Sequence, residues 1–388
     1  MDMQHNKFQP ELSERLEGVG EYYFSRKLRE IDELRAGGKR IISLGIGSPD
    51  RPPHPSVVER LAKESALATT HGYQSYKGAP ALREAFARWY GERYSVELDA
   101  DREVLPLIGS KEGIMHICMT YLRAGDKVLI PNPGYPTYTS AVRLSGGVTV
   151  PYELCAERGW MPDTDALPTE GVKMMIINYP HMPTGTVASL DNLRRIVEFC
   201  RTNRILLLND NPYGFIRNEH PISLLQVEGA KEVAMELNSL SKSHNMAGWR
   251  VGMLAADADR IAEIMRFKSN MDSGMFLPLQ LAAATALSLG DEWYEEQNAE
   301  YRARERIGEA IFDALGLKYA PGQAGLFLWG ELPEGENCYE CCDRLLYDKG
   351  IFLTPGGIFG SAGERYMRLS LCAPQSVLAE VLEIVKQG

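Results

Sequence analysis

The sequence predicts an α/β protein with a mostly parallel central sheet. Through the middle of the chain, short β-rich runs alternate with amphipathic helical runs. This alternation is typical of a parallel sheet that helices cover. Polar motifs follow several of the apolar runs, and in such sheets ligands bind beyond the carboxyl ends of the strands.

Six apolar runs are predicted to be buried strands. They cover residues 126–133, 147–154, 172–179, 204–211, 232–239 and 250–257. Helical stretches lie between them, as at residues 113–123 and 190–203. The two ends of the chain carry amphipathic helices instead, at residues 21–35, which Gly37 and Gly38 stop, and at residues 377–386.

The composition indicates an ordinary globular protein of about two domains. The 388 residues are 44% hydrophobic and 24% charged. A net charge of −10, without any run of lysines or arginines, argues against a nucleic-acid partner. Residues 1–18 hold no apolar core of a secretory signal, and no apolar stretch approaches the ~20 residues that span a bilayer, so we expect no membrane association.

The seven cysteines predict reduced thiols in a cytoplasmic protein. Their number is odd and their positions are scattered, which does not fit a disulfide framework. Cys338, Cys341 and Cys342 include a Cys-x-x-Cys spacing that also occurs in zinc sites. No second Cys or His pair lies at a suitable spacing and the stretch has a helical pattern, so we expect structural thiols and no metal site.

The most informative segment is SLSKSHNMAGWRVG, residues 239–252. A buried-strand pattern runs into Ser-Leu-Ser-Lys, and Arg250 follows Lys242 along the chain. A lysine forms a Schiff base with the aldehyde of pyridoxal 5'-phosphate, while hydroxyls and a guanidinium bind its phosphate. The segment closely resembles the cofactor-lysine motif of the class I/II aminotransferases, which are fold type I pyridoxal-phosphate enzymes.

The resemblance covers residues 22–372, with the motifs in family order. It implies the fold type I architecture, in which a large domain with the central sheet binds pyridoxal phosphate. Both chain ends would then combine into a smaller α+β domain. We expect residues 1–47 and 286–388 to form the smaller domain and residues 48–285 the large one.

A phosphate site is predicted where Leu107-Ile108-Gly109-Ser110-Lys111 follows an apolar run and opens a helix. Backbone N–H groups at the start of a helix bind phosphate, and a glycine permits a close approach. The resemblance places the phosphate at Gly109, Ser110 and Lys111. Ser239 and Arg250 would complete the site, Arg250 through charge-assisted hydrogen bonds.

Three residues are expected around the cofactor ring. A carboxylate keeps the pyridine nitrogen protonated, so that the ring can accept electrons from the substrate. Asp210 ends an apolar strand and heads Asp-Asn-Pro-Tyr, which is similar to the family's Asp-x-x-Tyr. The resemblance assigns Asp210 to the ring nitrogen and Tyr213 to the ring hydroxyl O3'. In PNPGYPTY, residues 131–138, Tyr135 is the expected stacking residue.

An arginine near the C-terminus is expected to bind the substrate α-carboxylate, because a guanidinium binds a carboxylate through two parallel hydrogen bonds. Arg368 and Arg365 compete for this role in RYMRLSLC, and the Arg-x-Ser spacing to Ser370 favours Arg368. SLGIGSPDRPP, residues 43–53, resembles the glycine segment that closes over the same carboxylate, with Gly47 as the contact.

The segment HGYQSYKGAPALREA, residues 71–85, resembles the family segment that reaches into the partner subunit's site. Tyr73 would touch the phosphate across the interface of a homodimer with shared active sites. Ser269 and Asn270 are further candidates for the interface.

One motif departs from the family. Where relatives carry Asn-Pro-Thr-Gly, with an asparagine that donates to O3', this chain has Met182-Pro183-Thr184-Gly185. A thioether donates no hydrogen bond. Either Met182 fills space beside the cofactor, or the neighbouring His181 turns inward as a substitute donor. Adjacent residues in an extended chain point in opposite directions, which favours the first interpretation.

The implied activity is a pyridoxal-phosphate-dependent aminotransferase that exchanges an amino group between an L-amino acid and a 2-oxo acid. Lys242 would carry the cofactor and act as the general base. A carbon–sulfur β-lyase would use the same lysine, aspartate and arginine, and a non-catalytic regulator is a further alternative. The strings GSKEGI, YYFSRKL and KSNMDSG point to the branch of LL-diaminopimelate and aspartate aminotransferases. Arg266, Lys77 and His181 are candidates to bind a substrate side chain.

Met182 leads to a prediction about the cofactor. Donors to the O3' phenolate stabilise the unprotonated Schiff base, and one such donor is missing. We therefore expect the Schiff base of Lys242 to have a higher pKa than in relatives with the asparagine. A pH titration of the yellow chromophore measures this pKa, and a value well below neutrality would contradict the prediction.

Overall fold

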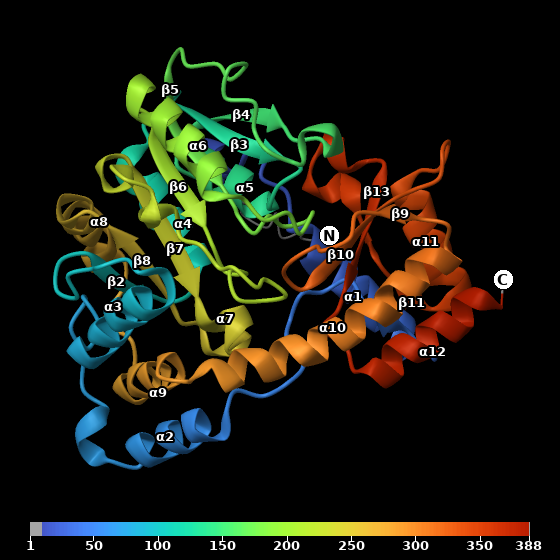
Figure 1. Ribbon diagram of the computed structural model, residues 1–388, viewed down its shortest axis with the longest axis horizontal. Coiled ribbons are helices and arrows are strands. Elements are labelled where there is room, and N and C mark those ends of the chain that lie inside the picture. Colours follow the sequence, from blue (N-terminus) through green and yellow to red (C-terminus); the bar gives the residue numbers. More distant parts are fainter. Residues whose placement is uncertain (1–9, 388) are drawn as a thin grey trace, which may run out of the picture.

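The computed structural model describes residues 10–387, and its larger sheet has seven strands (Figure 1). The strands are β2 (Val104–Leu107), β3 (Lys127–Asn132), β4 (Val148–Glu153), β5 (Val172–Ile177), β6 (Leu206–Asp210), β7 (Ala234–Ser239) and β8 (Gly252–Ala256). Their spatial order is β2-β8-β7-β6-β5-β3-β4. Only β8 runs antiparallel to its neighbours, and the other pairings are parallel. The predicted α/β fold is confirmed, and all six predicted strands are present.

Helices cover both faces of this sheet because successive side chains of its strands point to opposite sides. In β6, Leu207 belongs to one buried cluster and the next residue, Leu208, to another. The helices that accompany the sheet are α2 (Pro55–Ser65), α3 (Pro80–Tyr94), α4 (Ser110–Tyr121), α5 (Pro136–Leu144), α6 (Leu190–Asn203), α7 (Leu240–Ser243), α8 (Ala258–Met271) and α9 (Leu277–Leu287). Helices α4, α5 and α8 contribute to the cluster that contains Leu208, whereas α3 and α6 contribute to the cluster that contains Leu207.

Local sequence signals explain where several helices begin. Helices α2, α3, α5 and α9 each have a proline in their first turn, where the missing N–H leaves no hydrogen bond unmade. Helix α6 begins with a capping box, in which Ser189 Oγ accepts from the Asn192 N–H at 3.1 Å. The helix ends at Arg204, which has a left-handed backbone.

The smaller sheet is antiparallel and lies to the right of the larger one in Figure 1, next to the long helix α10 (Asp291–Ala314). Its strands are β9 (Lys318–Tyr319), β10 (Phe327–Glu331), β12 (Thr354–Pro355) and β13 (Tyr366–Ser370), in the order β12-β13-β10-β9. Helices α1 (Tyr23–Ala36), α11 (Cys338–Lys349) and α12 (Gln375–Lys386) accompany it.

Segments from the two ends of the chain come together beside this sheet. Strand β1 (Ile42–Ser43) pairs in parallel with β11 (Ile351–Phe352). Lys27 on α1 forms an ion pair of 3.3 Å with Asp343 on α11. The domain boundaries at residues 47 and 285 stay a prediction, and residues 1–9 of the expected N-terminal segment lie outside the described residues.

Two further features bear on the predictions from composition. All seven cysteines are free thiols, and Cys338, Cys341 and Cys342 are buried on α11. Among residues 10–387, no helix is long and apolar enough to cross a membrane.

Candidate active site

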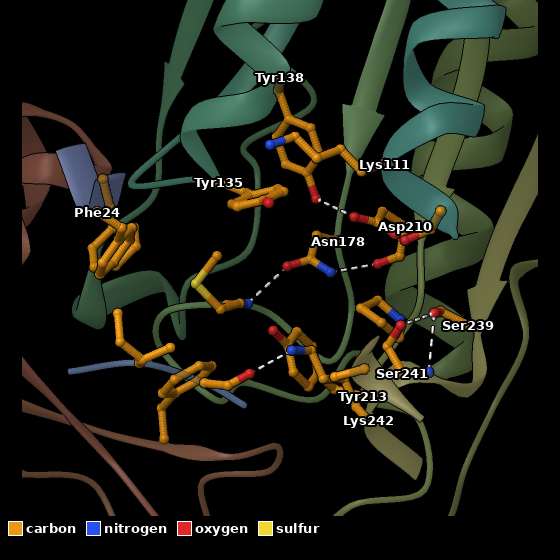
Figure 2. A pocket seen from close by; sticks show the side chains of 18 of the residues that line it. Phe24, Lys111, Tyr135, Tyr138, Asn178, Asp210, Tyr213, Ser239, Ser241 and Lys242 are labelled. Atoms are coloured by element: carbon orange, nitrogen blue, oxygen red, sulfur yellow. Dashed lines mark hydrogen bonds between the residues drawn. The ribbon is translucent and has the colours of Figure 1, made fainter. Parts of the chain in front are cut away.

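Most of the predicted cofactor residues line one cavity of about 320 Å³ at the carboxyl ends of β6 and β7 (Figure 2); Gly109 and Tyr73 are not among its lining residues. Helices α4 and α5 begin at its edge, and residues of α1, β10 and β13 close its other side. Its lining includes Gly47, Ser110, Lys111, Tyr135, Met182, Asp210, Tyr213, Ser239, Lys242, Arg250 and Arg368. Residues that are far apart in the sequence therefore meet at the sheet edge where ligands bind in such folds.

Lys242 lies on the short helix α7, directly after β7. Its ammonium group donates a hydrogen bond to the carbonyl oxygen of Gly47. Burial lowers the pKa of Lys242 below its ordinary value, because a charged amine is poorly solvated there. The neutral amine, which is the nucleophilic and basic form, is thereby favoured.

Asp210 is buried at the end of β6 with one carboxylate oxygen unpaired. Tyr138 donates to its Oδ2 at 2.9 Å, whereas Oδ1 has no hydrogen-bond partner. Burial raises the pKa of Asp210 to about 6, while the hydrogen bond from Tyr138 acts in the opposite direction. A buried oxygen without a partner is unfavourable unless a ligand supplies a donor. The protonated ring nitrogen of pyridoxal phosphate is a donor of that kind, so Asp210 fits the expected cofactor.

Hydroxyls and a guanidinium meet at the start of α4, where the phosphate is expected. Arg250 donates to the Ala247 carbonyl oxygen at 2.9 Å and to Ser241 Oγ at 3.3 Å, and Ser239 Oγ lies 2.9 Å from Ser241 Oγ. Gly109 has φ +82°, and a Cβ there would collide with the Arg250 guanidinium. Only glycine therefore leaves this space free, as a site for a bulky anion at a helix start requires.

Glu112 stabilises the loop before α4. Its carboxylate accepts from the backbone N–H of Ile108 and lies 2.9 Å from His116 Nε2. Asp272 adjoins the same carboxylate and is bound by the ammonium group of Lys268 at 2.7 Å. This partly buried polar cluster holds the backbone next to Gly109 through the Ile108 N–H.

Tyrosines and one amide surround the space in front of Asp210. Tyr135 packs edge-on against Tyr138, with ring centroids 5.6 Å apart, and burial raises the pKa of Tyr213 far above its ordinary value. Asn178 donates its amide hydrogen to the Asp210 carbonyl oxygen and accepts from the Met182 N–H at 2.8 Å (Figure 2). Asn178 thus connects the strand that carries Asp210 with the segment that carries Met182.

Arg368 is buried on β13, and aromatic rings lie around its guanidinium. The ring centroids of Phe327, Phe359 and Phe24 lie 3.8, 4.7 and 5.5 Å from its Cζ. Its Nη2 donates to the Gly45 carbonyl oxygen at 2.7 Å, and its Nε has no partner. Burial lowers the pKa of Arg368 to about 10, so the group stays charged at neutral pH. The competing Arg365 instead binds the Leu332 carbonyl oxygen at 3.0 Å and does not line the cavity.

The structure separates the two residues at the unusual motif. Met182 lines the cavity, and its sulfur lies 3.2 Å from Arg368 Nη1. His181 is buried elsewhere, with its Nδ1 2.8 Å from Thr184 Oγ1, and burial lowers its pKa to about 3. This arrangement favours the interpretation in which Met182 fills space, because His181 does not line the cavity.

The segments predicted to lie at a subunit interface do not reach this cavity. Tyr73 is 96% exposed, Asn270 is exposed and Ser269 is half-buried near the end of α8. Lys77 and Arg266, two candidates to bind a substrate side chain, are also exposed and outside the cavity lining.

Several lining residues were not predicted from the sequence. They are Tyr22, Phe24, Leu28, Ile46, Tyr138, Asn178, Ser241, Phe327 and Phe359. Tyr138 lies in the first turn of α5, three residues after Tyr135 at the N-cap of this helix, a spacing that could have indicated it. The aromatic residues around Arg368 had no such signal.

Comparisons with known proteins agree with this geometry. The family model of aminotransferase class I and II matches residues 39–385. A protein named LL-diaminopimelate aminotransferase from Dehalococcoides mccartyi is 40% identical over 95% of this chain and 96% of its own. A protein of the same name from Aquifex aeolicus is 37% identical over 97% and 98%. The solved structure of substrate-bound BacF from Bacillus subtilis has a TM-score of 0.93 at 32% identity, with 98% of each chain covered.

The raised pKa of Asp210 predicts a pH-dependent stability in protein stripped of cofactor. Since burial favours the protonated carboxyl, the folded state loses stability as the pH rises through about 6. Raising the pKa from 3.8 to about 6 corresponds to roughly 3 kcal/mol. Asp210→Asn should therefore raise the free energy of unfolding by up to about 3 kcal/mol at pH 8 and by almost nothing below pH ~4.

Denaturant unfolding at both pH values measures this difference. Asp163→Asn, at an exposed carboxylate, serves as the control and should change the free energy of unfolding by less than about 0.5 kcal/mol. An Asp210→Asn effect that is equal at both pH values would contradict the assignment of a buried, ionising carboxylate.

Proposed function

Because the chain belongs to the aminotransferase class I and II family and is a pyridoxal-phosphate-dependent aminotransferase, we propose that the cavity around Lys242 is its active site. There an amino group passes between an L-amino acid and a 2-oxo acid. The observation that carries the proposal is that a half-buried lysine, an unpaired buried carboxylate and a buried arginine line one cavity. These three groups are what is needed to carry the cofactor, to protonate its ring and to hold an α-carboxylate.

We assign the cofactor contacts as follows. The backbone at Gly109, Ser110 and Lys111, together with Ser239 and Arg250, holds the phosphate, supported by the hydroxyls and the guanidinium that meet at the start of α4.

At the ring, Asp210 accepts from the nitrogen through its unpaired Oδ1, Tyr213 serves O3' and Tyr135 stacks on the ring. Met182 contacts the cofactor without donating a hydrogen bond. When bound, pyridoxal phosphate supplies the electron sink for the carbon from which a proton is removed.

Lys242 is proposed as the proton carrier. Burial lowers the pKa of Lys242, which favours the neutral amine that a general base requires. The Gly47 carbonyl oxygen accepts from this amine and so fixes its direction within the cavity.

Arg368 is proposed to orient the substrate through its α-carboxylate. Its Nε lacks a partner and its Nη1 faces only the weak acceptor Met182 Sδ, so two N–H directions are open to a carboxylate. Gly47 lies beside it, where bulk would collide with Phe327. The substrate is thereby placed next to Lys242.

A homodimer with shared active sites completes the proposal. Tyr73 is a large side chain that is 96% exposed in one chain, which is unusual for an aromatic residue and fits a contact with a second copy. The reduced state of all seven cysteines supports a cytoplasmic location. The relatives named for LL-diaminopimelate make this amino acid one of the donors to test.

The function predicts a spectral change on adding single amino acids to the purified yellow protein. A suitable donor should bleach the cofactor band, and a 2-oxo acid should restore it. Lys242→Ala should slow this bleaching by at least about 10³-fold, because it removes the general base. Lys318→Ala, at an exposed lysine, is the control and should keep the full rate.

Two outcomes would contradict amino transfer. Pyruvate and ammonia accumulating while the band persists would indicate a carbon–sulfur β-lyase. A band that no amino acid changes would indicate a cofactor-binding protein without turnover.

The shared site predicts a role for Tyr73 in cofactor affinity. If Tyr73 donates to the phosphate of the partner's cofactor, Tyr73→Phe should raise the dissociation constant of pyridoxal phosphate about 10-fold or more, the value of one hydrogen bond to a charged group. Tyr339→Phe, at an exposed tyrosine on α11, should leave it unchanged. Fluorescence titration measures the constant, and a monomer in sedimentation would overturn the proposal.

A further inference from the structure

The inference rests on the proposed function and concerns the side chain of the amino donor. The cavity is lined by five apolar residues, Phe24, Leu28, Ile46, Phe327 and Phe359, which we call the apolar wall, and its three phenylalanine rings lie around the Arg368 guanidinium. Figure 2 shows Phe24 on the side of the cavity away from Asp210 and Ser239. The apolar wall therefore lies opposite the groups assigned to the cofactor.

The geometry of Arg368 directs a substrate toward this wall. Aromatic rings lie 3.8 and 4.7 Å from its Cζ, so they pack against the guanidinium, while Nε remains without a partner. A guanidinium binds a carboxylate in its own plane, through its N–H edge. The rings thus leave the position of the substrate α-carboxylate open, and they lie around the substrate atoms beyond this carboxylate.

Helix α1 contributes apolar side chains that are not fully buried in the protein core. Phe24 and Leu28 are four residues apart and share one face of the helix. Leu28 lines the cavity but is still 37% exposed, which leaves apolar area available for a ligand.

The described part of the chain provides few charges for the far end of a substrate. The cavity is lined by four cationic side chains, and Lys242, Arg250 and Arg368 already have assigned roles. The fourth, Lys111, has its ammonium group 4.8 Å from the ring centroid of Tyr22, at the phosphate helix. A second carboxylate or a distal ammonium placed against the apolar wall would lose hydration, and none of the five residues of the wall carries a charge that could pair with it.

We propose that this enzyme prefers amino acids with a bulky apolar side chain, aromatic or branched aliphatic, over those with a charged distal end. The wall supplies the contact area for such side chains. The same wall penalises glutamate, aspartate and LL-diaminopimelate.

Donor specificity of the loaded enzyme tests the proposal. We expect kcat/KM for phenylalanine or leucine to exceed that for glutamate, aspartate and LL-diaminopimelate by about 10-fold or more, the range of discrimination that one apolar pocket provides. A preference for any of the three charged donors would overturn the inference while leaving amino transfer intact. If no amino acid reacts at all, the proposed function itself fails.

A binding measurement separates side-chain recognition from turnover. In calorimetry with unreactive acids, Phe24→Ala should weaken binding of 3-phenylpropionate about 10-fold or more and that of glutarate less than about 3-fold. Tyr347→Ala, at an exposed aromatic on α11, is the matched control and should change neither. Equal weakening of both acids by Phe24→Ala would show that Phe24 only supports Arg368, and would overturn the apolar wall as a specificity element.

Discussion

A carboxylate buried at the end of β6 constrains much of the surrounding structure. Asp210 has one oxygen bonded to Tyr138 and the other without a partner, and burial raises its pKa to about 6. The position is unfavourable for folding on its own, because an ionised carboxylate loses its hydration there. The large sheet, buried on both faces, supplies the stability that tolerates this cost. The stability of the large sheet therefore offsets the cost of burying the Asp210 carboxylate.

The glycine segment after β1 connects the two ends of the cavity. Its Gly47 carbonyl oxygen accepts from Lys242, and its Gly45 carbonyl oxygen accepts from Arg368. A Cβ at Gly45 would collide with Phe352, so a small residue is required for this close approach. Further along, Asp50 receives two hydrogen bonds from Arg304 of α10, at 2.6 and 3.0 Å. Lys242 and Arg368 are thus both bound to one short stretch of backbone, which Arg304 of the long helix holds through Asp50.

The sequence predicted the site residues best where a chemically reactive side chain directly follows a predicted strand. Lys242 and Asp210 each follow an apolar run, so their meeting at one sheet edge could be anticipated from the parallel fold. The choice between Arg365 and Arg368 agrees with the structure, because Arg368 lies on β13 and lines the cavity, whereas Arg365 precedes this strand and binds the Leu332 carbonyl oxygen. Asn178 was not anticipated, because its importance depends on contacts with the backbone of Asp210 and Met182. Phe24 belongs to a helix that any amphipathic pattern would predict, but its approach to Arg368 depends on how the chain ends pack.

Met182 links the cofactor end of the cavity to its substrate end. An asparagine at this position would present an amide that can donate and accept, whereas the thioether of Met182 only faces Arg368 Nη1 at 3.2 Å. A weak acceptor leaves the guanidinium available to a carboxylate, because little is lost when the substrate replaces it. The same side chain extends the apolar surface that begins at Phe24 and Phe327. Met182 and the aromatic residues around Arg368 therefore act in the same direction, toward the proposed site that holds an α-carboxylate by charge and the remainder of the substrate by apolar contact.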